Sequence, residues 1–121
     1  MTTCSSTGTV ENSTAVPISV EQAHRLHGHA GVEFVDPRPA EAVAATTGRI
    51  PDARLIAIED VEAGNLPPAF ADRSLHVVAS CQAGPMAARA AAAFAKLGFA
   101  RVNWIEGGTQ AWVEAGLPTV R

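Results

Sequence analysis

The fold of this chain is decided by one stretch, Leu75-His76-Val77-Val78-Ala79-Ser80-Cys81-Gln82-Ala83-Gly84-Pro85-Met86. An apolar run enters a short loop, and an alanine-rich helical pattern begins at Pro85. Strand, loop and helix in this order are typical of one unit of a parallel α/β sheet. The loop therefore lies at the carboxyl end of a strand, which is the edge where open α/β sheets bind their ligands.

Cys81 is the residue of this loop that can carry chemistry. A lone cysteine at a strand end can be a small buried hydrophobic residue or a reactive thiol. The helix that follows offers unpaired N–H groups and its positive dipole end, and both favour the nucleophilic thiolate. Gly84 and Pro85 favour a curled loop, since glycine accepts a positive φ and proline is preferred at the first helical position. We expect the loop amides to converge on the sulfur as an anion site.

Similar patterns around this unit predict a complete α/β domain. Ser19 and Gln22 form a capping box for a helix that runs to about His29, and Gly98 caps the long helix over 85–97. Other strands are expected at 17–18, 32–35 and 54–58, and short helices at 39–45 and 59–62. We predict roughly five short, mostly parallel strands with helices on both faces. A flavodoxin-like or nucleotide-binding fold is the main competitor, but the chain has no G-x-G-x-x-G sequence and no Walker loop.

The length of 121 residues and the hydrophobic content of 47% predict a single globular domain. Residues 1–15 are rich in Ser, Thr, Gly and Asn, so they cannot bury enough apolar surface to offset their ordering entropy. We predict a disordered tail over 1–15 and the folded domain over 16–121. Cys4 lies in this tail, where it could take part in the chemistry of Cys81 or have no role.

The charge pattern argues against a nucleic-acid or membrane partner. Nine basic residues are scattered among twelve acidic ones, with a net charge of −3 and no basic run. The sequence has no stretch of 18 apolar residues and no secretory signal pattern at its start. With only Cys4 and Cys81 present, a structural disulfide is not expected, and we predict a cytoplasmic protein.

Several segments together resemble the single-domain rhodanese family. They are Cys81-Gln82-Ala83-Gly84, Gly98-Phe99, Val102-Asn103-Trp104-Ile105-Glu106-Gly107-Gly108, Ala111-Trp112 and Ala115-Gly116-Leu117-Pro118, which match its active-site loop, last strand and closing helix. In the first half, Val35-Asp36-Pro37-Arg38 followed by Glu41 is similar to the family's Asp-x-Arg stretch. Gly48-Arg49-Ile50-Pro51-Asp52-Ala53 looks like its Gly-His-Ile-Pro-Gly-Ala turn with two substitutions. The resemblance extends from Pro17 to Val120.

This resemblance implies a rhodanese-like three-layer domain and a sulfurtransferase that works without a cofactor. A sulfane sulfur would pass from thiosulfate, mercaptopyruvate or a thiol persulfide to a thiol or cyanide, through a persulfide on Cys81. A protein persulfide is a further candidate partner. Substrate-binding positions would be Gln82, Ala83, Gly84, Met86 and Ala87, and supporting residues would be Asp36, Arg38 and Arg89. The alternative is a rhodanese-like persulfide carrier or regulatory binding module with little turnover.

The loop departs from the family in its charge. Many rhodaneses carry an arginine or lysine two positions after the loop glycine, where this chain has Met86, and Gln82 is also neutral. Arg89 could supply a charge or be a solvated surface residue. A neutral loop favours an organic or protein persulfide donor over thiosulfate.

Other chemistries fit the sequence less well. Asp36, Arg38 and Glu41 are expected to form structural ion pairs rather than to act on substrate. No cysteine or carboxylate cluster joins the histidines His24, His27 and His29, so no metal site is predicted. A cysteine-dependent phosphatase needs an arginine six residues after its nucleophile to hold the tetrahedral anion, and that position here is Ala87.

Overall fold

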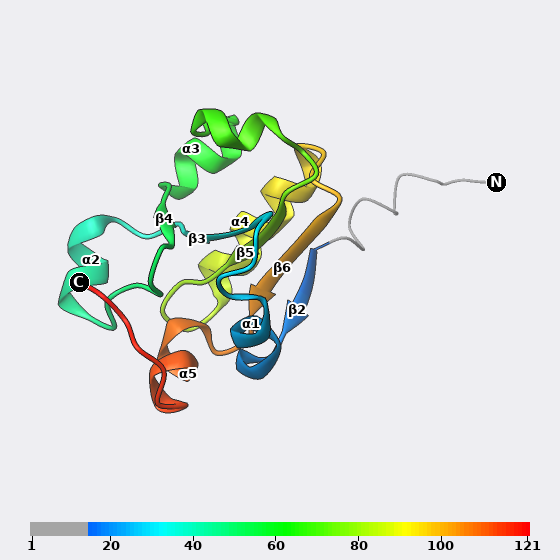
Figure 1. The fold of residues 1–121 in the computed structure, drawn as a ribbon. Helices are drawn as coiled ribbons and strands as arrows, with labels where there is room; N and C mark the ends of the chain where they lie inside the picture. The colour runs from blue at the N-terminus through cyan, green and yellow to red at the C-terminus, as the bar shows by residue number, and fades with distance from the viewer. Residues whose placement is uncertain (1–14) are drawn as a thin grey trace.

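The structure is a computed structural model that describes residues 15–121 (Figure 1). Its elements follow in the order β2 (Ala15–Ile18), α1 (Val20–Leu26), β3 (Val32–Asp36), α2 (Ala40–Ala45), β4 (Arg54–Leu55), α3 (Ile58–Ala63), the 3-10 helix η2 (Pro68–Ala71), β5 (His76–Ala79), α4 (Pro85–Lys96), β6 (Arg101–Ile105) and α5 (Gly108–Glu114). No helix in this range is long and apolar enough to cross a membrane.

Five strands form one sheet in the order β2-β6-β5-β3-β4, and every neighbouring pair is parallel. This confirms the predicted α/β class. The strand β5 lies in the middle, between β3 and β6. Because the strands are parallel, the loop after β5 lies at the same sheet edge as the segment after β3, and both predicted functional stretches meet there.

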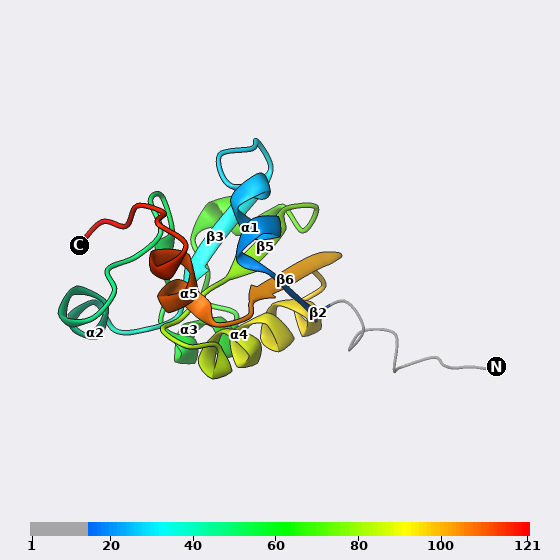
Figure 2. The same cartoon turned by 90° about the horizontal axis from the view of Figure 1, so that it is seen from below.

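Helices cover both faces of the sheet, as predicted (Figure 2). Successive strand residues alternate between two buried clusters, since side chains along a strand point to opposite faces. In β5, Val77 and Ala79 pack with α3 and α4, whereas Val78 packs on the face covered by α1 and α5. Small alanines on α4 allow it to approach the sheet closely, and its buried residues are Ala87, Ala90, Ala91, Phe94 and Ala95.

The ends of the first helix are set by local chemistry. The predicted capping box is confirmed: Ser19 Oγ accepts from the Gln22 amide at 3.1 Å, and Gln22 Oε1 accepts from the Ser19 amide at 2.8 Å. The helix stops at Leu26, three residues before the expected end, because His27 has extended dihedral angles.

The predicted strand over 54–58 is wrong beyond Leu55. Its partner β3 ends at Asp36, and the next residue, Pro37, has no N–H to continue the ladder. Two carbonyls still hold the departing chain, since Ile56 donates to Asp36 and Ile58 donates to Pro37, both at 3.1 Å. Ile58 already begins α3.

The start of the chain lies partly outside the described residues. Residues 1–14, including Cys4, are not described, so the disordered tail predicted over 1–15 stays a prediction for them. Ala15 is the first residue of the edge strand β2 and pairs with Val102 of β6. The edge strand expected at 17–18 is therefore present and longer than expected.

Candidate active site

Cys81 lies two residues beyond the end of the central strand β5, on the loop that leads into α4, and is 3% exposed. Its Sγ accepts hydrogen bonds from the amides of Gly84 at 3.1 Å and Ala87 at 3.3 Å. Gly84 is the N-cap of α4 and has a φ of 129°, a value that favours glycine. Two N–H donors at the positive end of a helix stabilise negative charge on this sulfur.

The predicted substrate-binding residues have different places in the loop. Gly84 and Ala87 donate to the sulfur, whereas Gln82 and Ala83 are exposed and donate nothing to it. The side chain of Met86 is half-buried against the core cluster that also contains Cys81. The loop thus offers its main chain, and no charged side chain, to the sulfur.

A second helix, α5, supports the Cys81 loop, and this contact was not predicted from the sequence. At the start of α5, the Thr109 amide donates to the Cys81 carbonyl at 2.7 Å and the Gln110 amide donates to the Gln82 carbonyl at 3.0 Å. A Cβ on Gly108 would lie 2.6 Å from both carbonyl oxygens, so only glycine allows this approach. The paired glycines Gly107-Gly108 after the last strand were the available sequence signal.

A buried hydroxyl pair completes this support. Ser80 Oγ and Thr109 Oγ1 are 2.7 Å apart, and both residues are almost fully buried. The pair joins the end of β5 to α5 at the residue before Cys81.

Asp36 and Arg38 form a buried ion pair with a structural task. Arg38 Nη2 lies 2.6 Å from Asp36 Oδ2, and Arg38 Nε donates to Asp36 Oδ1 at 2.9 Å. The remaining guanidinium donors reach Thr46 Oγ1, Thr47 Oγ1 and the Gly48 carbonyl at 3.1–3.2 Å. The pair therefore fixes the loop after α2 to the end of β3. Glu41 is exposed and forms no ion pair with any described residue.

Arg89 is engaged away from the sulfur. It forms a two-pronged ion pair with Glu62 of α3, with Nε to Oε2 at 2.5 Å and Nη2 to Oε1 at 2.7 Å. The hydrogen bond from Arg89 holds the pKa of Glu62 below its ordinary value, and Glu62 raises the pKa of Arg89 in return. Both side chains are exposed, so this pair adds little stability.

One cavity borders the Cys81 loop, through Gln82. It has a volume of about 360 Å³ and is lined by Thr46, Thr47, Gln82, Gln110, Val113, Thr119 and Arg121. We name it the loop cavity. Its walls come from the loop held by Arg38, from α5 and from the end of the chain, which lie near one another at this edge in Figure 1.

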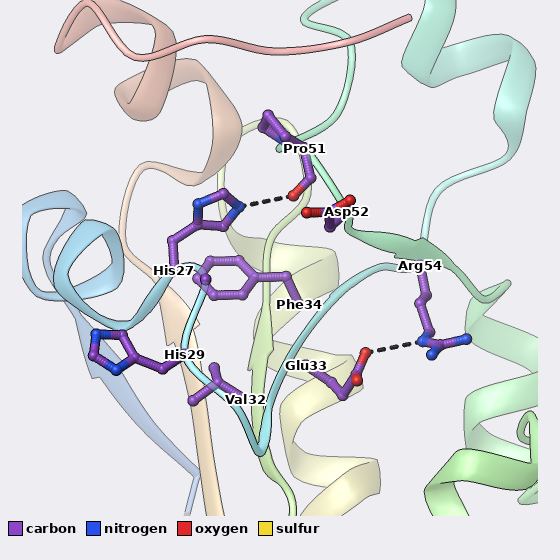
Figure 3. Close-up of a pocket in the computed structure, with 9 residues that line it drawn as sticks. His27, His29, Val32, Glu33, Phe34, Pro51, Asp52 and Arg54 are labelled. Carbon is purple, nitrogen blue, oxygen red and sulfur yellow. Dashed lines mark hydrogen bonds and ion pairs between the residues drawn. The ribbon is translucent and has the colours of Figure 1, made fainter.

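A second cavity, of about 350 Å³, lies at the opposite sheet edge (Figure 3). Its lining includes His27, which contacts the Pro51 carbonyl at 2.8 Å, and the exposed pair Glu33–Arg54 at 2.9 Å. Because it surrounds the start of β3 and β4, it is remote from Cys81. Within residues 15–121, no three His, Cys, Asp or Glu side chains gather in a way that could hold a metal ion.

A rhodanese-like domain family model matches residues 19–115. The chain belongs to the rhodanese-like domain family. It is similar to a Rhodopseudomonas palustris protein of unknown function that carries the description possible tyrosine phosphatase, at 26% identity and a TM-score of 0.80 over 99% of both chains. It is also similar to a rhodanese-like domain protein from Staphylococcus aureus, at 27% identity and a TM-score of 0.67, covering 88% of this chain and 99% of that one.

The human single-domain sulfurtransferase TSTD1 shares the fold at 24% identity and a TM-score of 0.67, covering 83% of this chain and 96% of the human one. A comparison with curated proteins finds no match. The rhodanese-like family and fold of this chain are thereby established.

Proposed function

We propose that this rhodanese-like domain is a sulfurtransferase that carries a sulfane sulfur on Cys81. The observation that supports this most directly is the pair of N–H donors, from Gly84 and Ala87, on a cysteine sulfur at the start of α4. Such donors hold a thiolate and stabilise the charge of a persulfide without any cofactor.

In the first half-reaction, the Cys81 thiolate attacks the outer sulfur of the donor. A new S–S bond forms on Sγ while the bond from that sulfur to the rest of the donor breaks. With thiosulfate the leaving group is sulfite, which keeps the electron pair, and with an organic persulfide it is the thiolate. With mercaptopyruvate the C–S bond breaks, and the carbon keeps the electron pair as the enolate of pyruvate, which then takes up a proton. The product is a Cys81 persulfide.

In the second half-reaction, a thiolate or cyanide attacks the outer sulfur of this persulfide. The S–S bond to Sγ breaks, its electron pair returns to Cys81, and the acceptor leaves as a persulfide or as thiocyanate. Each half-reaction transfers one sulfur atom, so no external oxidant or reductant is needed.

The neutral loop supports a preference among donors. No arginine or lysine side chain lies among Gln82, Ala83, Gly84 and Met86, and Arg89 is already paired with Glu62. Within the loop itself, a dianion such as thiosulfate would meet only main-chain amides and no cationic side chain, so we place organic persulfides, protein persulfides and mercaptopyruvate ahead of it. A reducing, cytoplasmic setting belongs to the same proposal, because Cys81 must remain a free thiol between turnovers.

The decisive experiment is intact-mass measurement after mixing with sulfur donors. We expect a gain of about 32 Da, the mass of one sulfur atom, that cyanide removes and that Cys81→Ser does not show. Multiple turnovers with a thiol acceptor would support an enzyme. One stable loading with little turnover would instead support the persulfide carrier, and no loading by any donor would contradict both.

Phosphatase activity is a weaker alternative, although one structural relative carries that description. Hydrolysis of a phosphate ester by a cysteine loop needs a guanidinium facing the transferred group, at the sixth residue after the cysteine. That residue is Ala87, whose side chain is fully buried in the core. We expect no turnover of aryl phosphates.

A further inference from the structure

The loop cavity has a lining that suits a small organic anion. Five of its lining residues are neutral and polar, namely Thr46, Thr47, Gln82, Gln110 and Thr119. Arg121 is the residue of the lining with a charged side chain, and the lining contains no Asp or Glu. A volume of about 360 Å³ is enough for a small molecule of several heavy atoms.

The fold holds the segment 117–121 firmly at this cavity. Trp112 Nε1 donates to the Pro118 carbonyl at 2.8 Å, and Val120 exchanges two main-chain hydrogen bonds with Arg49, at 2.7 and 2.8 Å. Gly48 permits this approach, because a Cβ there would lie 2.7 Å from the Val120 carbonyl. The wall that carries Thr119 and Arg121 is thus tied to the same loop that Arg38 anchors.

The guanidinium of Arg121 has N–H donors that are free to bind a ligand. Its Nη1 donates to the Ala44 carbonyl at 2.6 Å, which holds the side chain beside α2. A guanidinium has five N–H donors, and no other hydrogen bond or ion pair is formed by Arg121 within residues 15–121. Glu114 accepts from Gln110 Nε2 at 3.0 Å and so orients that amide of the lining.

From this arrangement we infer that Arg121 is a specificity-determining residue, and that the loop cavity recognises the carboxylate of a small thiol acceptor. The inference rests on the proposed function. The acceptor thiolate attacks the outer sulfur of the Cys81 persulfide, a new S–S bond forms in the product, and the electron pair of the broken bond returns to Sγ. Arg121 takes no part in this exchange and acts by holding the acceptor's carboxylate. It would supply from the end of the chain a charge that the loop itself lacks.

Single-turnover transfer from the loaded protein tests this inference. The Cys81 persulfide is formed to completion, the excess donor is removed, and the rate constant for sulfur loss is measured with two matched pairs of thiols. These are 3-mercaptopropionate with its methyl ester, and glutathione with its diethyl ester. Within a pair, the ester keeps the thiol and removes the carboxylate charge.

We expect Arg121→Gln to lower the rate constant for the acids by about fivefold, the scale of an exposed charge-assisted contact, and to leave the esters within about twofold. Arg121→Lys should retain most of the preference for acids. Arg101→Gln, which removes the same charge from an exposed residue at the opposite sheet edge, should change neither member of a pair.

The role of Arg121 would be overturned if Arg121→Gln lowered the rate constant equally for an acid and its ester. It would also be overturned if this variant lowered the rate constant for neither acid. Failure of any donor to load Cys81 in the unmodified protein is a separate result, since it would overturn the proposed function itself. Complete loading of Arg121→Gln, read from intact mass, shows that the variant is folded and that a changed rate reflects recognition.

Discussion

The hydrogen bonds to the Cys81 sulfur come from main-chain amides. Side chains of the loop therefore change the surroundings of the thiolate without changing these hydrogen bonds. Gly84 and Ala87 donate through their amides, and the residues between them are a proline without an N–H and Met86. Charge at the loop can therefore be varied while the cradle is left in place.

Met86→Arg tests whether the missing loop charge limits the use of thiosulfate. We expect the apparent KM for thiosulfate to fall about tenfold, since one charge-assisted contact contributes roughly 1.5 kcal/mol or more. Because Met86 is half-buried against the core, the substitution also removes packing, which we expect to lower the free energy of unfolding by about 1 kcal/mol. Steady-state kinetics and urea unfolding measure the two effects.

Met86→Gln is the matched control, because it removes the same packing without adding charge. It should be as destabilised as Met86→Arg and show no gain with thiosulfate. A KM that falls equally in both variants, or in neither, would mean that the neutral loop does not select the donor.

At the residue scale the sequence was informative about Cys81 because several local signals agreed. The apolar run, Gly84 and Pro85 all predict a curled loop with a thiol at its start. The pairing of Arg89 with Glu62 could not be predicted, because it depends on how α3 and α4 pack against each other.

At the scale of elements, α5 is the part that keeps the Cys81 loop in shape. Its first amides bind two consecutive loop carbonyls, and the Ser80–Thr109 hydroxyl pair joins it to the end of β5. These bonds fix the two peptides that follow Cys81, and with them the course of the chain toward Gly84, whose amide donates to the sulfur. Gly108 is the residue that lets the two elements come together.

Gly108→Ala should separate α5 from the loop. The new Cβ would lie 2.6 Å from two main-chain oxygens, so the helix or the loop must shift. We expect the free energy of unfolding to fall by about 3 kcal/mol and persulfide loading of Cys81 to slow, because the amide cradle is displaced. Urea unfolding and the time course of intact mass measure both.

Gly116→Ala serves as the comparison. Gly116 has a similarly positive φ of 83°, but nothing lies within 4 Å of its Cβ position. This variant should lose only the conformational strain, about 1 kcal/mol, and load at the normal rate. Equal behaviour of the two variants would show that the close approach of α5 does not matter for the site.

The elements that could be predicted are those with local signals. The capping box of Ser19 and the long alanine-rich helix appear in the structure as expected, because neighbouring residues alone define them. The end of β4 was misplaced, because a strand lasts only while its partner offers hydrogen bonds, and β3 ends at Asp36. The length of β4 is thus set by β3, a different segment of the chain, and not by the residues of β4 themselves.

At the scale of the whole molecule, three distant segments meet around the loop cavity. Arg38 ties the end of β3 to the loop 46–48, and Arg49 in turn binds Val120 near the end of the chain. The parallel topology was predictable, and with it the shared edge of Asp36, Arg38 and Cys81. The bridge between Arg49 and Val120 could not be predicted, because a single pair of residues so far apart in sequence leaves no periodic pattern.

The buried pair Asp36–Arg38 should control both stability and the shape of this edge. Arg38→Met leaves the Asp36 carboxylate without its partner at a site that is about 2% exposed, and it also removes the donors that hold Thr46, Thr47 and Gly48. We expect the free energy of unfolding to fall by about 3 kcal/mol, the scale for a broken buried pair. The double variant Asp36→Leu with Arg38→Met should recover part of this loss, since no charge is then left buried.

Arg54→Met provides the contrast, because it breaks the exposed pair with Glu33, whose side chains are 43% and 25% exposed. It should change the free energy of unfolding by no more than about 1 kcal/mol. Urea unfolding of the unmodified protein and the three variants gives these differences directly.

Sulfur transfer from the Cys81 persulfide to a thiol should slow in Arg38→Met and in the double variant alike, because both release the loop 46–48 that forms one wall of the cavity. A normal rate of sulfur transfer in the double variant would mean that this wall is not needed for the acceptor. If Arg54→Met lowered the free energy of unfolding as much as Arg38→Met does, the predicted difference between the exposed and the buried ion pair would be wrong.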